Sequence, residues 1–388
     1  MDSFEVAIVG AGPAGSTCAA FCAGAGLRTL LIEREKFPRE KVCGDCLNPS
    51  CWPVLRRLGI AERVRQLPHG ILNAVEFIAV GGRKVIIDLP PGEESEIAIK
   101  RSLFDMLLMS RARELGAQVY EQTTVTALTS SNGWKICSHG PVARPRLDAP
   151  QGRGSGLANS RGWKIETARG ATFAAQTLVG ADGRNSTVAR LCNWLPRPAR
   201  ERVALQAHIA LPAGFGNRVV LQFLPEGYSG QAPVNRDELN LCLVSNPSNM
   251  AALRHWAEKQ FALQQDHQWH TITPLTRAAL VPARKKLFLV GDAARVVEPF
   301  TGEGIYYALR SAELAAQAIV KVIRGNHDVD PASEYAEAHA AIYRGRLWIN
   351  RLARAAVLSP RITSFLIHAA RTQPILRSLT AKIVTPQL

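Results

Sequence analysis

Long apolar runs are absent from this 388-residue sequence, since no stretch reaches the ~18 uninterrupted apolar residues that a membrane-spanning helix needs. Zinc-finger and RNP-type motifs are also absent, so the net charge of +15 does not indicate a nucleic-acid partner. The nine histidines form neither an H-x-x-x-H nor an H-E-x-x-H pattern, and we expect no metal site. What remains is a chain whose 47% hydrophobic and 20% charged residues are typical of a globular protein.

Secretory features are lacking as well. Asp2 and Glu5 precede an apolar run that leads directly into a glycine turn, which is not the pattern of a signal peptide. Eight cysteines spread over a chain of this length favour free thiols in a reducing compartment over a disulfide framework. We therefore expect a cytoplasmic protein.

The first thirty-odd residues carry the strongest motif. An apolar run of strand length over residues 4–9 is followed by Gly10, Gly12 and Gly15 at the spacing G-x-G-x-x-G. Gly10 allows a tight turn, Gly12 lets the backbone approach a diphosphate, and Gly15 lets the following helix pack closely on the strand. A second strand-like run ends at Glu33, close to the expected position of a carboxylate that binds ribose hydroxyls. The pattern predicts dinucleotide binding.

Two further apolar strands end in acidic turns. Residues 177–186 contain Asp182-Gly183, and residues 287–294 contain Gly291-Asp292, followed by a Pro-Phe-Thr-Gly-Glu-Gly segment that opens an Ala-rich helix. Each carboxylate could accept hydrogen bonds from sugar hydroxyls, or could only cap a helix. The order of all three motifs favours a nucleotide ligand with a second polar edge at the last helix start.

The intervening segments predict an insertion of β-structure into a nucleotide-binding unit. Residues 51–64 and 101–115 have helical spacing, while residues 73–89 predict β-structure around a Gly81-Gly82 turn. Residues 118–128 predict a single strand. The unit is therefore not a simple Rossmann domain.

Residues 132–136 are echoed by residues 161–165, and the stretch between them is rich in Pro, Arg and Gly. We expect two strands of one hairpin joined by a long mobile loop, with a lid or docking arm as the alternative.

On these residues the chain resembles FAD-dependent flavoproteins of the glutathione-reductase-type fold, in the branch of para-hydroxybenzoate-type hydroxylases and geranylgeranyl reductases. The resemblance runs over residues 4–323 and implies an α/β fold: a Rossmann-like FAD-binding domain interleaved with a β-sheet substrate domain, and a helical C-terminus. The expected FAD-binding domain comprises residues 1–70, 100–190 and 280–325, the substrate domain residues 71–99 and 191–279, and the basic C-terminal helices residues 326–388.

The resemblance also implies roles for individual residues. Glu33 would hold the ADP half, Arg101 would reach FAD from the start of its helix, and Val125 would lie by the adenine. The full set of expected FAD-binding residues is Gly10, Gly12, Pro13, Ala14, Gly15, Glu33, Arg34, Cys43, Gly44, Arg101, Val125, Asp182, Gly183, Gly291, Asp292, Pro299, Gly302, Gly304 and Ile305.

Residues 41–45 and 302–308 are most similar to geranylgeranyl reductases, but two positions depart from that family. Arg295 stands where Gly is frequent, and the substrate motif Tyr-x-Trp-x-Phe-Pro maps onto residues 228–233 with both large rings lost. We therefore expect NAD(P)H-driven reduction of an activated double bond in a hydrophobic or aromatic small molecule, with hydroxylation of an aromatic or polyketide-type substrate as the alternative. The expected substrate-binding residues are Tyr228, Gly230, Pro233 and His208.

Catalytic side chains are harder to name, because flavin chemistry needs no dedicated nucleophile. Cys43 and Asp45 are candidates beside the flavin, and Cys43 with Cys46 has the C-x-x-C spacing of a redox pair. The alternative is a loop whose backbone abuts the ring. His208 could face the pocket, although a structural histidine is the safer interpretation.

Rival functions on the same fold are a flavin-dependent halogenase, for which the Trp-x-Trp-x-Ile-Pro signature is missing, and a non-catalytic prenyl-lipid binding protein of the Rab-escort type. Residues 340–388 carry seven Arg and one Lys with no acid, and Ile349 and Leu352 share a helical face opposite Arg351 and Arg354. This pattern keeps peripheral attachment to an anionic membrane open beside packing on the chain's own domain.

Overall fold

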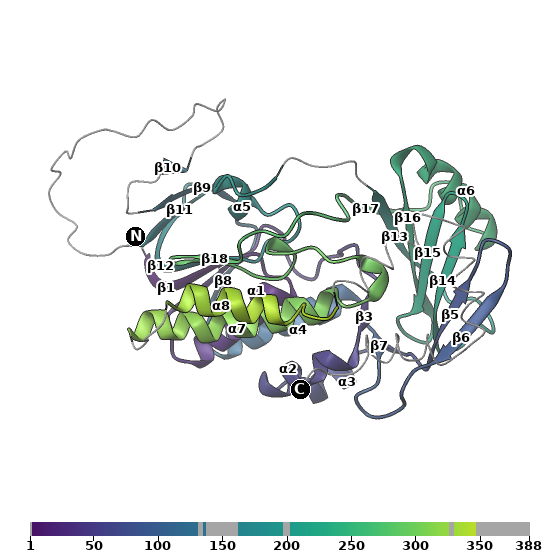
Figure 1. The fold of residues 1–388 in the computed structure, drawn as a ribbon, viewed down its shortest axis with the longest axis horizontal. Helices are drawn as coiled ribbons and strands as arrows, with labels where there is room; N and C mark the ends of the chain where they lie inside the picture. Colours follow the sequence, from purple (N-terminus) through teal and green to yellow (C-terminus); the bar gives the residue numbers. More distant parts are fainter. Residues whose placement is uncertain (1, 131–134, 137–161, 197–201, 326–329, 347–388) are drawn as a thin grey trace, which may run out of the picture.

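The computed structural model describes residues 2–130, 135–136, 162–196, 202–325 and 330–346. Two large sheets lie at opposite ends of an elongated molecule, joined by loops and a small third sheet (Figure 1). The two sheets define two halves of the molecule, which are called the nine-stranded half and the seven-stranded half below.

The nine-stranded half is built around three parallel strands. β1 (Asp2–Val9) pairs in parallel with β2 (Thr29–Ile32) on one side and with β12 (Thr172–Gly180) on the other. The inner residues of β1 and all of β2 are buried, which explains their nearly continuous apolar runs, because parallel strands are covered on both faces. The remaining strands of this sheet are β8 (Gln118–Tyr120), β9 (Val125–Ser130), β10 (Lys135–Ile136), β11 (Trp163–Thr167), β18 (Ala283–Arg284) and β19 (Leu287–Leu289).

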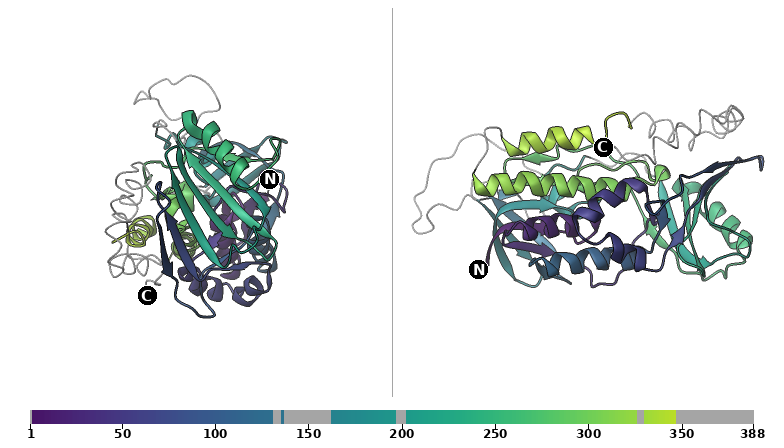
Figure 2. Two further views of the ribbon diagram at one scale, coloured as in Figure 1. Left: turned by 90° about the vertical axis from the view of Figure 1, so that its right-hand side faces the viewer. Right: turned by 90° about the horizontal axis from the view of Figure 1, so that it is seen from below.

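Helices cover one face of this sheet side by side (Figure 2). α1 (Pro13–Gly24) begins with a proline and is buried over most of its surface, because its Ala, Cys and Gly residues allow close packing against two other helices. These are α4 (Arg101–Glu114) and α7 (Gly304–Arg324), and α8 (Pro331–Ala341) packs on α7. α7 is strongly amphipathic, as a helix that lies on a core must be.

The seven-stranded half has the strand order β17-β13-β16-β15-β14-β5-β6. Its strands come from two separate parts of the chain, and α6 (Met250–Gln260) packs on one of its faces. The bounds are β5 (Ala74–Ile78), β6 (Lys84–Asp88), β13 (Val203–Ala210), β14 (Arg218–Leu224), β15 (Gly227–Pro233), β16 (Glu238–Ser245) and β17 (His270–Ile272).

Short elements connect the two halves. The third sheet has the order β3-β7-β4, and four 3-10 turns punctuate the loops. The bounds are β3 (Cys46–Leu47), β4 (Gly70–Ile71), β7 (Ile97–Ala98), α2 (Trp52–Arg57), α3 (Ala61–Gln66), α5 (Thr187–Leu191), η1 (Pro49–Cys51), η2 (Pro247–Asn249), η3 (Gly291–Ala293) and η4 (Pro299–Thr301).

The α/β architecture is confirmed, and three local expectations are wrong. The single strand expected over residues 118–128 is two strands, because Gln122 has a positive φ of 52° and the chain turns there. The helix expected over residues 51–64 is broken at Gly59, whose φ is +71°. The expected hairpin does not form, since β10 and β11 both pair with β9, which therefore lies between them.

The seven cysteines that the structure describes are all free thiols: Cys18, Cys22, Cys43, Cys46, Cys51, Cys192 and Cys242. Within the described ranges, no helix combines the length and apolarity needed to cross a membrane. The amphipathic segment with Ile349, Arg351, Leu352 and Arg354 lies outside the described residues.

Candidate active site

The glycine turn between β1 and α1 has the close contacts expected from its sequence. Gly10 has a φ of +100°, and a Cβ there would stand 2.6 Å from the carbonyl oxygen of Ala181. A Cβ on Gly15 would stand 1.7 Å from the carbonyl oxygen of Gly10, so the turn closes only around a bare backbone. Pro13 and Ala14, buried at the start of α1, complete the turn. Gly12 faces outward, and its nearest side-chain atoms are guanidinium nitrogens.

Glu33 lies at the end of β2, directly beside the turn. Its carboxylate is 5% exposed and accepts hydrogen bonds from the backbone N–H groups of Ala11, at 2.7 Å, and of Glu35, at 3.0 Å. The side chain therefore ties the glycine turn to the sheet, in addition to any contact with a ligand. Arg34, in contrast, is exposed at the surface beside Glu35, and the structure does not bring its side chain to the turn.

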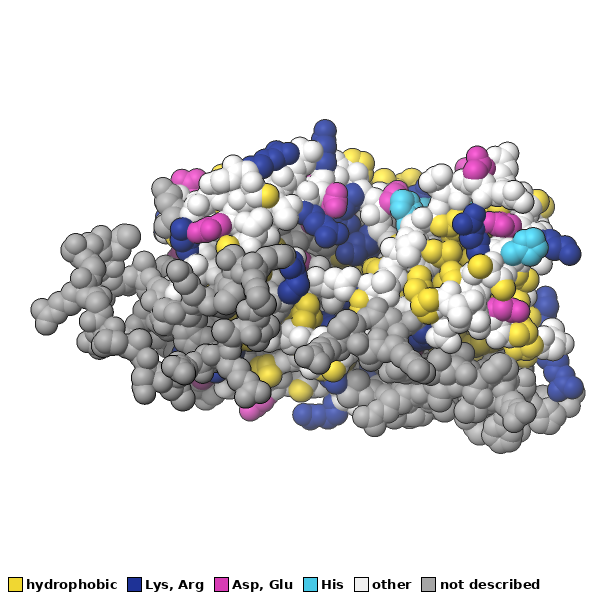
Figure 3. Space-filling model, turned by 90° about the horizontal axis from the view of Figure 1, so that it is seen from above, with side chains coloured by type: hydrophobic (Ala, Val, Ile, Leu, Met, Phe, Trp, Pro, Cys, Tyr) yellow, Lys and Arg dark blue, Asp and Glu magenta, His cyan; other side chains and the backbone are white. Residues whose placement is uncertain are grey.

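Three cationic side chains gather over Gly12 and Gly183. A Cβ on Gly12 would stand 3.7 Å from NH2 of Arg39 and 3.9 Å from NH2 of Arg101. A Cβ on Gly183 would stand 3.5 Å from Nζ of Lys41. We call Arg39, Lys41 and Arg101 the cation cluster. Figure 3 shows Lys and Arg side chains gathered where the two halves meet.

The carboxylate of Asp105 pairs with two members of the cation cluster. Arg101 donates from Nε and NH2 to both carboxylate oxygens of Asp105, at 2.7 and 2.8 Å, and Arg39 NH1 lies 3.3 Å from the same carboxylate. Burial, and then repulsion from Arg39 and Arg101, lowers the pKa of Lys41 to about 8. One buried carboxylate thus holds the guanidinium groups in place while the cluster keeps an excess of positive charge.

Arg39 and Lys41 were not expected in the site. They belong to a loop in which basic residues follow the end of β2, and only Arg101 was singled out from the sequence. The high number of Lys and Arg residues directly after Glu33 was the sequence feature that could have indicated a cationic loop at the site.

Asp182 has a structural role. Its carboxylate accepts from the Ser186 hydroxyl, at 2.6 Å, and from the backbone N–H of Val188, at 3.0 Å, and so stabilises the start of α5. Burial raises the pKa of this carboxyl group. Of this motif, Gly183 faces the cation cluster, because its φ of +82° turns the chain there.

Asp292 lies in η3 and pairs with NH2 of Arg184 at 3.0 Å. Its backbone carbonyl accepts from Arg277 at 2.6 Å. The neighbouring Gly291 has a φ of +56°, and its N–H donates to Ser311 of α7 at 2.9 Å. The Asp292 carboxylate is 30% exposed, so one side remains accessible to a ligand hydroxyl.

Two glycines in the segment before α7 differ in their backbone conformation. Gly302, just after Pro299 and η4, has a φ of +68° and needs the conformational freedom of glycine. Gly304 has no positive φ, and no described atom lies within 4 Å of where its Cβ would stand, so the protein's own backbone does not require a glycine there. Gly304 is a bare, open first position of α7, and Ile305 behind it is buried in the core.

Val125 lies in β9 and is buried among Phe4, Leu128 and other residues of the core under the nine-stranded sheet. Because the side chain of Val125 is buried in the core, the expected contact with an adenine would have to come from its backbone or from the edge of β9.

The loop over residues 43–46 contradicts the redox-pair hypothesis. Burial raises the pKa of both the Cys43 and Cys46 thiols, which disfavours the thiolate that attacks in thiol–disulfide exchange. Cys46 begins β3, so the C-x-x-C spacing does not open a helix. Gly44 has no described atom within 4 Å of its Cβ position. The loop instead presents its backbone, and the Cys43 carbonyl accepts from Asn240 at 2.8 Å.

The expected substrate residues divide into two groups. Tyr228 joins an aromatic cluster with Phe77, Phe223 and Phe300, in which Phe300 lies 5.7 Å from the Phe223 and Tyr228 ring centroids and 6.2 Å from that of Phe77. Phe300 comes from the Gly302 segment, so the aromatic cluster joins the two halves.

Gly230 and Pro233 lie farther along β15. A Cβ on Gly230 would meet Leu221, 3.6 Å away, and the Pro233 carbonyl lies against Gly70 of β4. The structure therefore does not bring Pro233 into the aromatic cluster. His208, on β13, contacts Asp45 at 2.8 Å and is the fourth expected substrate residue.

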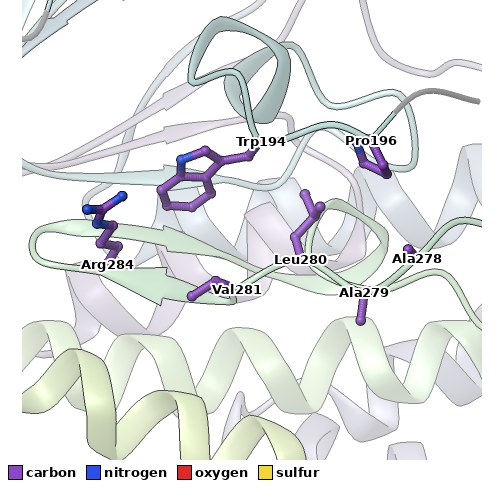
Figure 4. Close-up of a pocket in the computed structure, with 7 residues that line it drawn as sticks. All are labelled: Trp194, Pro196, Ala278, Ala279, Leu280, Val281 and Arg284. Carbon is purple, nitrogen blue, oxygen red and sulfur yellow. The ribbon is translucent and has the colours of Figure 1, made fainter. Parts of the chain in front are cut away.

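One open pocket lies away from these residues. It measures about 650 Å³ and is lined by Trp194, Pro196, Ala278, Ala279, Leu280, Val281 and Arg284 (Figure 4). None of the expected site residues lines it, and the groups described above define the candidate site instead.

The residues present fit a bound dinucleotide. The turn that a Cβ would fill, the cation cluster and the accessible Asp292 carboxylate together suit a diphosphate flanked by sugar hydroxyls.

Comparisons with known proteins find relatives over most of the chain. The family described as the FAD binding domain matches residues 3–133 and 245–345, which is more than half of the chain. A menaquinone reductase of Mycobacterium tuberculosis is 30% identical over 82% of this chain and 77% of the reductase. The digeranylgeranylglycerophospholipid reductase of Thermoplasma acidophilum is 27% identical over 84% of this chain and 80% of its own length.

Conditioned medium factor receptor 1 of Dictyostelium discoideum is 27% identical over 82% of this chain, and the chain spans 63% of the receptor's length. Among solved structures, the flavin-dependent brominase Bmp2 has a TM-score of 0.76 at 19% identity and covers 98% of this chain and 93% of its own. At that identity the likeness concerns the fold. The expected flavoprotein fold and the relation to geranylgeranyl-type reductases are confirmed.

Proposed function

Since this chain belongs to the FAD-binding domain family of flavoprotein oxidoreductases, we propose that it is an NAD(P)H-driven reductase of an activated double bond in an apolar small molecule. FAD, when bound, supplies hydride transfer between the nicotinamide and that double bond. The substrate class is an isoprenoid or a quinone-like ring. The names of the relatives and the apolar lining of the site both support this class.

In this proposal the nine-stranded half holds the cofactor. The cation cluster holds the diphosphate, with charge-assisted hydrogen bonds that are stronger than neutral ones. Glu33 and Asp292 bind sugar hydroxyls from the two ends of the site. The bare N-terminal turn of α7 at Gly304 gives the flavin ring an approach that no described side chain obstructs.

The observation that carries the proposal is the aromatic cluster. Phe300 lies two residues before Gly302 and packs on Phe223 and Tyr228 of the opposite sheet. An apolar wall thus begins directly beside the segment where the flavin is expected. Phe223 and Tyr228 are buried in this cluster, so the half-buried rings of Phe77 and Phe300 are those that would exclude water and bind a planar or polyprenyl substrate by area burial.

The lipophilic substrate class also favours the membrane proposal. Each basic residue near an anionic lipid surface contributes about 1 kcal/mol of binding. Residues 340–388 carry eight cations and no acid, but Arg346 is buried and paired with Glu303, so at most seven of them could face a membrane. Flotation with anionic vesicles at low and high salt tests this attachment, and a protein that stays unbound at low salt contradicts it.

The experiment that tests the function is NAD(P)H oxidation by the FAD-loaded protein, with and without oxygen, in the presence of a menaquinone analogue or a geranylgeranyl compound. The proposal expects oxidation that depends on substrate, continues without oxygen and yields a product heavier by two hydrogens. A product that gains one oxygen would identify the hydroxylase alternative, and a product that gains a halogen would identify a halogenase. A purified protein that cannot be reconstituted with FAD would contradict every enzymatic assignment.

A further inference from the structure

A fully buried carboxyl group lies in the loop between the two halves. Asp45 is 0% exposed, and its φ of 60° places it in the left-handed region that non-glycine residues seldom adopt. Its carbonyl accepts from the Ile99 N–H at 2.9 Å, which fixes this backbone conformation. Asp45 Oδ1 accepts no hydrogen bond from any described residue. A buried carboxyl oxygen without a partner is costly, and it persists where it serves a ligand.

The other oxygen of Asp45 meets a histidine from the seven-stranded half. Asp45 Oδ2 lies 2.8 Å from Nε2 of His208. The second ring nitrogen of His208, Nδ1, lies 3.9 Å from a carboxylate oxygen of Glu40. The side-chain exposures rise from 1% at Asp45 to 12% at His208 and 39% at Glu40. An imidazole therefore links a buried carboxyl group to a carboxylate at the surface.

Neutral amides hold this arrangement in place. Gln206, next to His208 on the same face of β13, donates to Asn240 Oδ1 at 3.0 Å and lies 3.3 Å from His208 Nε2. Asn240 in turn donates to the Cys43 carbonyl at 2.8 Å, so a strand of the seven-stranded half is hydrogen-bonded to the loop that carries Asp45. The positions of Asp45 and His208 are thus determined together.

The loop also adjoins the expected cofactor site on both sides of Asp45. The Cβ position on Gly302 lies 3.9 Å from Cβ of Cys46. Cys43, two residues before Asp45, interacts with Arg101 of the cation cluster. Asp45 therefore lies between the segment expected at the flavin ring and the segment expected at the diphosphate.

We propose that Asp45, His208 and Glu40 form a proton relay that supplies the proton for reduction of the substrate double bond. The inference rests on the proposed function. Bound FAD would supply a hydride to one carbon of the double bond and Asp45 would give a proton to the other, so two electrons and two hydrogens would enter the double bond. Asp45 then regains its proton from His208, and His208 regains its own from solvent, with the Glu40 carboxylate 3.9 Å from Nδ1 stabilising the positive charge on the ring. NAD(P)H supplies the hydride that reduces FAD again.

The charges around Asp45 suit this task. Burial raises its pKa to about 6, although His208 and Arg101 oppose the shift and Glu40 adds to it. The thiols of Cys43, Cys46 and Cys242 lie nearby and remain protonated, since burial raises the pKa of each. An acid with a pKa near neutrality is suited to give and regain a proton at physiological pH.

If Asp45 and His208 had only a structural role, the hydrogen bond between them would be sufficient. The following variants distinguish that role from a proton relay. His208→Gln keeps a hydrogen-bonding group beside Asp45 but cannot carry a proton. Asp45→Asn keeps the size of the side chain and removes the acid. His270→Gln is the matched control, because His270 is exposed on β17 of the same sheet.

The experiment uses the FAD-loaded protein with 15N-labelled histidine, pre-reduced without oxygen, and geranylgeraniol as the probe substrate, because its reducible groups are carbon–carbon double bonds. At a fixed pH, the 15N ring signals of His208 should differ between the wild type and Asp45→Asn, because Asp45 Oδ2 lies 2.8 Å from Nε2 of the ring. Substrate reduction should fall by about 100-fold in both Asp45→Asn and His208→Gln, the size of effect that general acid catalysis has. FAD content and reduction of FAD by NAD(P)H should remain as in the wild type and in His270→Gln.

Each failure has a separate meaning. Identical His208 ring signals in wild type and Asp45→Asn overturn the relay, whatever the reaction. Wild-type rates of substrate reduction in His208→Gln also overturn it and leave the proposed function standing. A wild-type protein that reduces no substrate overturns the proposed function together with the delivery step, and ring signals that change in Asp45→Asn would still support the Asp45–His208 pair.

Discussion

The two halves of this protein present opposite surfaces to the space between them. The nine-stranded half offers bare backbone at Gly12 and Gly304 and a cluster of three cations over one buried carboxylate. The seven-stranded half offers aromatic rings, neutral amides and the imidazole of His208. A charged cofactor and an apolar substrate need different surfaces. We therefore expect substitutions in the nine-stranded half to change cofactor affinity, and substitutions in the seven-stranded half to change substrate choice.

The largest effect should come from the backbone of the cofactor half. In Gly15→Ala the new Cβ would stand 1.7 Å from the Gly10 carbonyl oxygen, a clash that only movement of the turn can relieve. We expect a loss of about 4 kcal/mol or more in the free energy of unfolding and loss of bound FAD. Gly81→Ala, in the β5–β6 turn with no described atom within 4 Å, is the control and should retain both. Denaturant unfolding and FAD absorbance measure the two properties.

The next effect concerns charge. Arg101→Met removes one member of the cation cluster and leaves Asp105 without its bidentate partner. FAD affinity should fall by about tenfold or more, because a charge-assisted hydrogen bond contributes about 1.5–3 kcal/mol. Lys100→Met, which breaks only the partly exposed pair with Glu238, should bind FAD normally. Equal titration curves for the two variants would remove Arg101 from the cofactor site.

A substitution at Gly304 should affect FAD binding without affecting the stability of the protein. Because no described atom lies within 4 Å of its Cβ position and valine has a higher helix propensity than glycine, Gly304→Val should unfold with at least nearly the wild-type stability. FAD binding should nevertheless weaken, since the added atoms enter the expected place of the ring. Normal FAD binding in a stable variant would show that the ring lies elsewhere.

Lys41 makes the cofactor half sensitive to pH. Its pKa of about 8 means that the ammonium loses its proton as pH rises through that value, and with it the attraction for phosphate. FAD affinity should fall several-fold between about pH 7 and pH 9, and FAD should raise the pKa of Lys41 on binding. Isothermal titration at both pH values, repeated on Lys41→Met, measures this. A variant with the same pH dependence as the wild type would exclude Lys41 as the cause.

The smallest effect should come from the seven-stranded half. Tyr228→Phe removes a buried hydroxyl and keeps the ring that packs on Phe223 and Phe300. Stability should change by about 1 kcal/mol or less, and FAD affinity should not change. The KM for substrate is where an effect should appear. A loss of FAD affinity comparable to that of Arg101→Met would contradict the division between the halves.

The same division explains how far the sequence predicts this molecule. The glycine turn, Glu33 and the Gly291-Asp292 turn follow from local spacing, because each concerns a strand that ends where the chain reverses. The seven-stranded sheet does not, since β5 pairs with β14 across more than a hundred residues of intervening chain. Pairing of Asp45 with His208 likewise joins residues 163 positions apart. Arg39 and Lys41 were missed because spacing does not show which loop cations fold back over a turn.

The most direct test of the account is the fate of the bound flavin without oxygen. The FAD-loaded protein is reduced with one equivalent of NAD(P)H, geranylgeraniol is added anaerobically, and flavin absorbance is followed together with product mass. The account predicts that oxidised-flavin absorbance returns in step with a product that has gained two hydrogens. A flavin that stays reduced until oxygen is admitted, with a product that gains an oxygen atom, would contradict it.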